Sequence, residues 1–273
     1  MDALGITVIV STYNNEEWLA KVLEGYKYQT YDNFEVMVAD DGSRPSTKEL
    51  IDSFRADYPV PLHHVWHEDE GYRRQRILNI AITKANMPYI LFTDGDCIPR
   101  KDFVEVHARF AEEGYFLSGG YCKLPMSTSK AIAPKDIECE DCFDVKWLKK
   151  HGPLRGTQSL KLSSGPALSS ILDFVTPTNA SFNNCNSSAW KEDLIAINGY
   201  DERMQYGGPD RELGERLENK GLKSKQIRHK AIVLHLDHAR GYKTKESLER
   251  NLAIRKAVKE ENKVWTEYGI KKG

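Results

Sequence analysis

The stretch Tyr89-Ile90-Leu91-Phe92-Thr93-Asp94-Gly95-Asp96 decides the fold of this chain. Its first five residues are apolar, aromatic or β-branched without a polar alternation, which is typical of a strand buried on both faces of a parallel sheet. The strand ends in two carboxylates, and the glycine between them lets backbone or a ligand approach closely. Carboxylate oxygens are the donors that Mg²⁺ and Mn²⁺ prefer. Asp94 and Asp96 are therefore candidate metal ligands, although solvated turns show the same pattern.

Two earlier stretches repeat this arrangement. Residues 6–11 and 34–39 are β-branched apolar runs, and each ends in a polar turn. Helices expected at 16–29, 47–57 and 73–85, with a short strand at 62–66, complete an alternation that predicts right-handed crossovers and a mostly parallel α/β sheet. Ligands bind beyond the carboxyl ends of such strands. One edge should therefore gather Thr12, Tyr13, Asn14, Asp40, Asp41, Asp94 and Asp96.

The remaining chain is expected to complete the same domain. Residues 125–177 lose their apolar period and gain Ser, Lys, Pro and Gly, so we interpret them as an insertion with one short helix at 147–152. The other expected elements are helices at 103–113, 191–198, 210–220 and 245–268 and strands at 115–124 and 231–236. We divide the chain into residues 1–120, residues 121–240 of the same domain, and a helical tail at 241–273.

Composition narrows the classes of protein. The 273 residues carry 39 Lys and Arg against 40 Asp and Glu, so no overall field attracts nucleic acid or an acidic bilayer. We find neither a basic leader with a long apolar stretch nor an apolar run that spans a membrane, which predicts a cytoplasmic protein. A position at the inner face of the membrane stays open, through peripheral contact of the lysine-rich terminal helix.

The five cysteines are an odd number spread over a long chain, which favours reduced thiols. Cys139 and Cys142 form a C-x-x-C without a second pair at zinc spacing, so we treat them as part of a loop.

The turn Asp40-Asp41-Gly42-Ser43 allows two interpretations. Asp, Gly and Ser all favour turns for local reasons. Alternatively, one carboxylate accepts a hydrogen bond from the N–H of a pyrimidine base, and Thr12 and Tyr13 complete the base pocket.

Three motifs in this order resemble the family 2 glycosyltransferases with the GT-A fold. They are Val8-Ile9-Val10-Ser11-Thr12-Tyr13-Asn14, Val38-Ala39-Asp40-Asp41-Gly42-Ser43, and Phe92-Thr93-Asp94-Gly95-Asp96-Cys97-Ile98-Pro99. The resemblance implies an enzyme that uses Mn²⁺ or Mg²⁺ and moves a sugar from a UDP-sugar donor to a hydroxyl of a glycan or glycolipid acceptor, of capsule or lipopolysaccharide type. It further implies that Asn14, Asp94 and Gly95 contact the donor, and that residues 125–177 line the acceptor side.

The segment from Glu70 to Asn79 resembles the family segment that faces the nucleotide and diphosphate, which implies donor contacts from Arg73, Arg76 and Asn79. The alternative is that Arg73, Arg74 and Arg76 form a solvated helix face.

The segment from Asn198 to Leu213 resembles the family's Gly-rich loop and the acidic pair that follows it on a helix. It implies acceptor contacts from Gly207 and Gly208, and Asp210 as the general base of an inverting transfer. Pro209 stands where the family usually has the first acid. Pro and Asp at this point also suit a helix start without any catalysis.

His235 and His238 follow a strand, where the family often places a metal-coordinating histidine, so we expect both as ligands; structural histidines are the alternative. Arg240 and Lys243 are expected to meet the phosphates when this tail closes. Trp190, like Trp147 and His151, is a candidate platform for a sugar ring, although a lone Trp is more often part of a core.

Two further functions stay open. A nucleotidyltransferase also places carboxylates at such an edge, but the acidic Tyr13-Asn14-Asn15-Glu16-Glu17 lacks the usual phosphate loop. A binding module without turnover is the other alternative, because of Pro209. No G-x-G-x-x-G follows the first strand, which disfavours a dinucleotide-binding domain.

Overall fold

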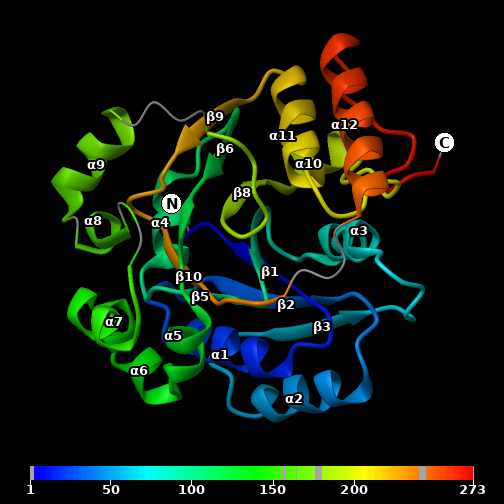
Figure 1. The fold of residues 1–273 in the computed structure, drawn as a ribbon. Coiled ribbons are helices and arrows are strands. Elements are labelled where there is room, and N and C mark those ends of the chain that lie inside the picture. The colour runs from blue at the N-terminus through cyan, green and yellow to red at the C-terminus, as the bar shows by residue number, and fades with distance from the viewer. Residues whose placement is uncertain are drawn as a thin grey trace.

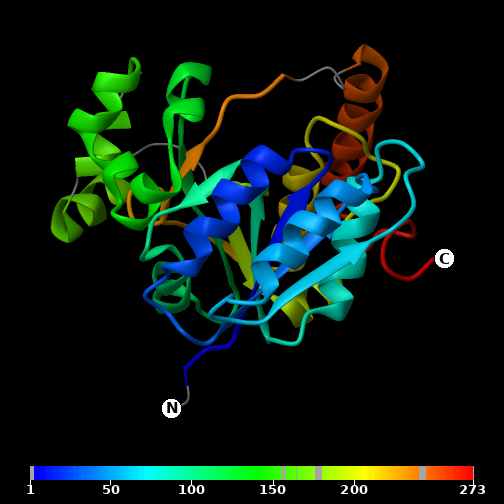
Figure 2. The same ribbon diagram turned by 90° about the horizontal axis from the view of Figure 1, so that it is seen from below.

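The computed structural model describes residues 3–154, 156, 158–163, 165–175, 180–239 and 244–272 (Figures 1 and 2). Its centre is a seven-stranded sheet in the order β3-β2-β1-β4-β8-β6-β9, and a three-stranded sheet in the order β5-β10-β7 stands beside it. The strands are β1 Ile6–Thr12, β2 Phe34–Asp40, β3 Leu62–Trp66, β4 Tyr89–Asp94, β5 Cys97–Pro99, β6 Tyr115–Ser118, β7 Gly120–Lys123, β8 Ser187–Trp190, β9 Lys223–Gln226 and β10 Ile232–His235.

Helices cover both faces of the large sheet (Figure 2). They are α1 Glu16–Lys27, α2 Pro45–Arg55, α3 Arg74–Lys84, α4 Phe103–Phe110, α5 Met126–Ala131, α6 Pro134–Glu138, α7 Val145–His151, α8 Gln158–Ser163, α9 Pro166–Val175, α10 Lys191–Ala196, α11 Pro209–Asn219 and α12 Lys245–Glu260, with a 3₁₀ turn at Asp141–Phe143. Alternate residues of β1 point to opposite faces, so Val8 and Val10 join the core under α1, whereas Ile9 joins the core under α3.

The N-terminal part of the sheet is parallel, as the apolar runs predict. β1 pairs in parallel with both β2 and β4, and β2 pairs in parallel with β3. The register places Ser11 opposite Asp94, and Thr12 opposite Asp40. The carboxyl ends of β1, β2 and β4 therefore form one continuous edge.

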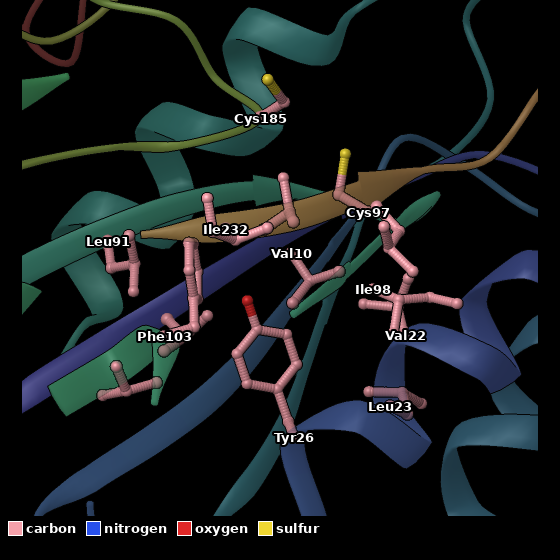
Figure 3. Packing of buried hydrophobic residues seen from close by; sticks show 14 of the residues in the cluster. Val10, Val22, Leu23, Tyr26, Leu91, Cys97, Ile98, Phe103, Cys185 and Ile232 are labelled. Atoms are coloured by element: carbon pink, nitrogen blue, oxygen red, sulfur yellow. The ribbon is translucent and has the colours of Figure 1, made fainter. Parts of the chain in front are cut away.

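Helix α1 packs closely on the small sheet. A Cβ on Gly25 would lie 2.7 Å from Cδ of Pro99, so only glycine allows this approach without a shift. Figure 3 shows Val22 and Tyr26 of α1 near Val10 of β1 and Ile98 of β5 in one apolar cluster. This packing fixes the short strand that follows Asp96.

Strand β8 lies between β4 and β6 and runs antiparallel to both. The sequence analysis did not predict it. The expected strand at 115–124 divides into β6 and β7 at Gly119, where a Cβ would lie 2.0 Å from Oδ1 of Asn186. The C-terminal half thus completes the sheet that the N-terminal half begins.

Two expectations about helices are wrong. The described part of the insertion has five helices where one was expected, and Ile132, Ile137 and Leu148 pack into the core beside α1. The terminal helix ends at Glu260 instead of residue 268. The chain then turns back, and Asn198 donates from Nδ2 to the carbonyl oxygens of Thr266 (2.6 Å) and Lys271 (2.8 Å).

Within the described ranges, no helix combines the length and the apolar character that crossing a bilayer requires.

Candidate active site

The turn Asp94-Gly95-Asp96 lies directly against the end of β1. The Gly95 N–H donates to the carbonyl oxygen of Ser11 at 2.8 Å. A Cβ on Gly95 would lie 3.0 Å from that oxygen and 3.2 Å from Oγ1 of Thr12. Glycine therefore allows the turn to touch β1, and this contact fixes the two carboxylates.

Asp94 forms an ion pair with Arg74. Its Oδ1 accepts hydrogen bonds from the Arg74 guanidinium and, at 2.9 Å, from Oγ of Ser11. The guanidinium also donates to Oγ of Ser11 at 2.8 Å. Burial lowers the pKa of Arg74, but Asp94, Tyr72, Tyr200 and Asp210 together outweigh it and the net shift is upward. A fixed positive charge therefore stands at the centre of the edge.

Asp96 lies with His235 and His238 in a compact group, whose ligand atoms are all within 4.8 Å of one another. The distance from Nε2 to the nearer Asp96 oxygen is 3.1 Å for His238 and 4.0 Å for His235. β10 brings these histidines to the site, since His235 pairs with Cys97 directly after Asp96. The two rings are stacked, with centroids 5.5 Å apart.

The hydrogen bonds of both imidazoles leave Nε2 available to bind a cation. Nδ1 of His235 lies 2.8 Å from the carbonyl oxygen of Leu236, and Nδ1 of His238 lies 2.8 Å from that of Ala239. A carbonyl oxygen only accepts, so each Nδ1 carries the proton and donates it. Each Nε2 then carries a lone pair and faces the Asp96 carboxylate. Two acceptors in this arrangement are stabilised by a proton or a metal ion between them. This is the second-sphere pattern of metal-binding histidines, and the oxygen and nitrogen donors fit a divalent ion.

Burial raises the pKa of Asp96, with a further upward contribution from Asp94 and downward contributions from the two histidines. A divalent ion would favour the ionised form.

Asp210 faces the same space from the start of α11. Burial raises the pKa of its carboxyl group, backbone N–H groups of Arg211 and Asn184 lower it, and the charges of Arg74 and Asp94 act on it in opposite directions. Oδ1 accepts from the Arg211 N–H at 3.0 Å. The N-cap of α11 is Gly208 rather than Asp210, so its carboxylate does not serve as the N-cap.

Gly207 and Gly208 have φ angles of +105° and +99°, a region that favours glycine. They form the turn that brings Asp210 to the site. Whether they contact an acceptor, as the resemblance implies, stays a prediction.

Asp40 and Asp41 both have their two carboxylate oxygens paired within the protein. Asp40 is fully buried and accepts from the Ser43 N–H at 2.8 Å, while its other oxygen lies 2.9 Å from Nε2 of His64. Asp41 is also buried, and its two oxygens face Nε2 of His67 at 2.9 Å and the Arg73 N–H at 3.1 Å. Burial raises its pKa to about 6. A place for either carboxylate in the base pocket stays a prediction.

The other residues expected to bind the base lie at the predicted edge. Tyr13 is half exposed, and its hydroxyl donates to Asp69 at 3.0 Å. Oγ1 of Thr12 is buried without a partner among the described residues. Oδ1 of Asn14 accepts from the Arg44 N–H at 2.9 Å, which ties the ends of β1 and β2 together.

Among the arginines, the site uses Arg74. Arg73 and Arg76 are exposed and pair with Glu70 at 3.1 and 3.4 Å. Both were predicted to bind the donor, whereas Arg74 was only considered as part of a solvated face. The sequence gives three arginines within four residues and no signal for which one faces inward.

Two predicted residues lie elsewhere. Asn79 is buried and bonds to Tyr200 through Oδ1 and Nδ2, so it stabilises a loop and offers nothing to a nucleotide. Trp190 pairs with Tyr89 at the opposite end of β4, about 16 Å along the strand from Asp94. Its Nε1 donates to the Glu112 carbonyl oxygen, and its ring packs on Tyr89. Its role as a sugar platform is wrong for this site.

Asn184 is a site residue that the sequence analysis did not select. Its Oδ1 accepts from the Tyr200 hydroxyl, and its Nδ2 is buried without a partner in the described part of the chain. Its backbone N–H bonds to Asp210. Arg240 and Lys243, expected to approach the phosphates, lie outside the described residues.

Comparisons with known proteins identify related families. Residues 7–134 match the family described as glycosyl transferase family 2, and residues 169–239 match the N-terminal domain of galactosyltransferase. An uncharacterized glycosyltransferase of Bacillus subtilis, YfnE, is 27% identical over 279 residues, covering 90% of this chain and 68% of the relative. For other curated relatives the chain spans as little as 12% of their length.

Solved structures show the same fold. Residues 1–349 of S. aureus TarS in complex with UDP align with a TM-score of 0.62 at 18% identity, over 97% of this chain and 68% of that one. The mannosyltransferase PcManGT from Pyrobaculum calidifontis, in complex with GDP-Man and Mn²⁺, aligns with a TM-score of 0.57 at 19% identity, over 87% and 58%. The expected GT-A fold is confirmed.

Proposed function

Because the chain belongs to glycosyl transferase family 2 and has the GT-A fold, we propose that it transfers a sugar from a UDP-sugar to a hydroxyl of a glycan or glycolipid acceptor. The transfer needs Mn²⁺ or Mg²⁺ and inverts the anomeric carbon. The acceptor belongs to a surface polysaccharide of capsule or lipopolysaccharide type. The UDP bound to the TarS structure supports the choice of nucleotide, and the GDP-Man bound to PcManGT makes GDP-sugars the competing choice.

One observation carries this proposal. Asp96, His235 and His238 bring three ligand atoms together, with the histidine tautomers fixed by backbone carbonyls. Asp94 ends β4, just before Asp96, and pairs with Arg74, and the charges of both Asp94 and Arg74 act on the Asp210 carboxyl group. The edge thus has a cation-binding side and a basic carboxylate.

The chemistry divides between these two sides. A divalent ion bound by Asp96, His235 and His238 would neutralise the charge of the diphosphate leaving group. Arg74 holds Asp94 in place and adds a positive charge beside the same phosphates. Thr12 and Asp41 lie at the mouth of β1 and β2, where they would bind the uracil ring.

Asp210 acts as the general base. Its carboxylate takes the proton of the acceptor hydroxyl while the oxygen forms a bond to the anomeric carbon, and the bond from that carbon to the diphosphate breaks. The diphosphate leaves with the electron pair. A single displacement inverts the configuration, and no covalent enzyme intermediate is needed. The upward shift in the pKa of Asp210 makes it a stronger base than an exposed carboxylate.

The test separates donor binding from transfer. Calorimetric titration with UDP-, GDP-, CMP- and dTDP-sugars, each with and without Mn²⁺, should show metal-dependent binding of one UDP-sugar. Asp96→Ala should lose that binding. Asp210→Asn should keep it and lose between about a hundredfold and ten-thousandfold in turnover.

A folded wild-type protein that binds no nucleotide sugar would contradict the proposal. Release of pyrophosphate from a nucleoside triphosphate and a sugar phosphate would identify a nucleotidyltransferase instead. Binding of a UDP-sugar by wild type, without transfer to water or to any acceptor, would identify a binding module.

A further inference from the structure

Helix α9 presents its apolar side to the solvent. Phe174 is 91% exposed, Val175 59% and Ile171 58%, and Leu168 one turn earlier is 43% exposed. These four residues recur at helical spacing, so they share one side of the helix. A surface helix of a soluble protein normally buries such a stripe. The orientation of α9 therefore needs an explanation.

Polar bonds hold α9 in this orientation. Asp173 is buried and accepts from the backbone N–H of His229 at 3.0 Å, lies 2.7 Å from Nδ1 of the same residue, and pairs with Nζ of Lys230 at 2.6 Å. Ser169, one turn before Asp173, is also buried. The side of α9 that faces the protein is thus partly polar, and this arrangement directs the apolar side outward.

The charge around this helix is also unusual for the chain. Residues 145–172 contain the basic residues Lys146, Lys149, Lys150, Arg155 and Lys161 and no Asp or Glu, although the whole chain has a net charge of −1. The three lysines of α7 are exposed, and none of them forms an ion pair with another described residue. Figure 1 places α7, α8 and α9 on one side of the molecule, opposite α11 and α12, and Figure 2 agrees.

We propose that α7, α8 and α9 form a membrane-docking lobe that binds the surface of an anionic lipid bilayer. The exposed apolar side of α9 enters the boundary between headgroups and acyl chains, and the α7 lysines meet the lipid phosphates. A second copy of the chain fits less well, because pairing two such lobes would bring the exposed lysines of two α7 helices together, although acidic residues at 136–144 precede each of them. The terminal helix α12 is less suited, since it mixes acidic and basic residues and Leu252 is its one strongly exposed large apolar side chain.

The lobe is attached to the strands that carry the candidate metal ligands. Nε2 of Gln158 in α8 donates at 2.8 Å to the carbonyl oxygen of Lys123, and Lys123 pairs with His235 in the small sheet. Asp173 holds His229 and Lys230, which immediately precede β10. Docking would therefore place the active edge near the bilayer. This geometry favours an acceptor that is itself anchored in the lipid, an inference that rests on the proposed function.

The test uses the full chain and sedimentation with vesicles. Wild type should bind vesicles of phosphatidylcholine mixed with phosphatidylglycerol, and added salt should weaken the binding. The double variant Ile171→Glu/Phe174→Glu should partition at least about tenfold less. Lys149→Glu/Lys150→Glu should lose the preference for phosphatidylglycerol. Leu252→Glu is the control for Ile171→Glu alone, since it places one carboxylate on a similarly exposed apolar residue of α12, and it should bind like wild type.

Circular dichroism and thermal melting of each variant exclude unfolding as the cause. The proposal is overturned if wild type does not bind anionic vesicles at low salt, or if Ile171→Glu/Phe174→Glu binds them like wild type. It is also overturned if light scattering shows a dimer that this double variant separates while vesicles stay unbound, because the face is then an interface between copies.

Donor binding distinguishes this proposal from the proposed function. Ile171→Glu/Phe174→Glu should bind the UDP-sugar with Mn²⁺ like wild type, because neither residue lies at the active edge. Vesicle binding by a wild-type protein that binds no nucleotide sugar would leave the docking lobe standing and remove the proposed enzyme.

Discussion

A histidine beside a carboxylate has different roles at different places in this molecule, and the other hydrogen bonds of each pair distinguish these roles. Nε2 of His64 lies 2.9 Å from Asp40, whose other oxygen accepts the Ser43 N–H, so this pair is closed. His235 and His238 donate from Nδ1 to carbonyl oxygens and direct Nε2 at a single carboxylate. Only the second arrangement leaves room for an added cation.

We expect His238→Ala to bind Mn²⁺ at least about tenfold more weakly than wild type, because loss of even a second-sphere partner costs that much at a metal site. Isothermal titration with MnCl₂ measures it. His63→Ala is the control, since its Nε2 faces Glu35 on the side of β3. Equal affinities of His238→Ala and wild type would remove His238 from the ligand set.

The pKa of Asp210 gives a second prediction. Its pKa is raised by burial, and a general base acts only when ionised, so kcat/KM should fall as the pH is lowered through this raised pKa. Arg74 opposes the rise, so Arg74→Met should move the midpoint of this fall to higher pH. The pH profile of transfer measures both.

Arg76→Met is the control, because Arg76 is exposed and pairs with Glu70. An unchanged midpoint in Arg74→Met would show that Arg74 does not act on the base.

The site residues that the sequence analysis found are those with a fixed place in a motif. Asp94 and Asp96 follow a strand that the apolar run predicts, and the structure brings Asp210, predicted from a loop and helix start, to the same edge. Arg74 could not be chosen over Arg73, because the side that a residue faces at the start of α3 depends on the preceding turn. Trp190 was misplaced because its strand, β8, was not recognised.

At the scale of single elements, polarity in the core explains why β8 was not recognised. Its sequence is Ser-Ser-Ala-Trp, without the apolar run of a buried strand. Ser188 is nevertheless fully buried, and its Oγ lies 2.7 Å from Nδ1 of His107, whose Nε2 lies 2.9 Å from Oδ1 of Asn186. A polar strand is stable in the core only when a residue of another element, such as His107, pairs with its polar groups. The spacing of residues along the chain does not show such a partner.

His107 makes the stability of this element depend on pH. Burial lowers its pKa from 6.5 to about 3. Between pH 6.5 and about pH 3 the imidazole is therefore protonated in the unfolded chain and neutral in the folded chain. The contribution of this group to stability falls as the pH falls through that range. The slope is about 1.4 kcal/mol per pH unit. His107→Gln should remove it.

Urea unfolding at a series of pH values between these limits compares the two proteins. Parallel pH dependences for wild type and a folded His107→Gln would show that the imidazole is already charged in the native state.

Helix α11 depends on a buried ion pair. Arg216 donates to both oxygens of Glu212, at 2.6 and 2.8 Å, and to the carbonyl oxygens of Ile197 and Gly199. Neither side chain is more than 1% exposed. Arg216→Met should destabilise the protein by about 3–5 kcal/mol, because it leaves a carboxylate buried without a partner. Chemical denaturation measures the loss.

Arg211→Met on the same helix is exposed and should change stability by less than about 0.5 kcal/mol. Replacing both members of the pair, as in Glu212→Gln/Arg216→Met, should recover part of the loss. A cost below about 1 kcal/mol for Arg216→Met would show that α11 does not need this pair.

For the whole molecule, the candidate metal site joins two distant parts of the chain. Asp96 follows β4, His235 ends β10, and His238 follows three residues later. An ion held by both binds the native state only, so Mn²⁺ at about a hundred times its dissociation constant should add about 2.7 kcal/mol of stability. For a chain of this size that raises Tm by roughly 5–10 °C.

Thermal melting with and without MnCl₂ measures this shift, and Asp96→Ala should show almost none of it. An equal shift in Asp96→Ala would place the stabilising ion at another site.

The order of strands in the large sheet has a consequence for how the protein is made. β1, β2, β3 and β4 are neighbours in the sheet and lie within the first 94 residues, so they can pair while the chain is still being synthesised. His238 leaves the ribosome 142 residues after Asp96, which takes roughly 7–28 s at 5–20 residues per second. During that interval the nascent chain carries the carboxylates but not the histidines. It should therefore gain affinity for metal in one late step, after His238 has been synthesised.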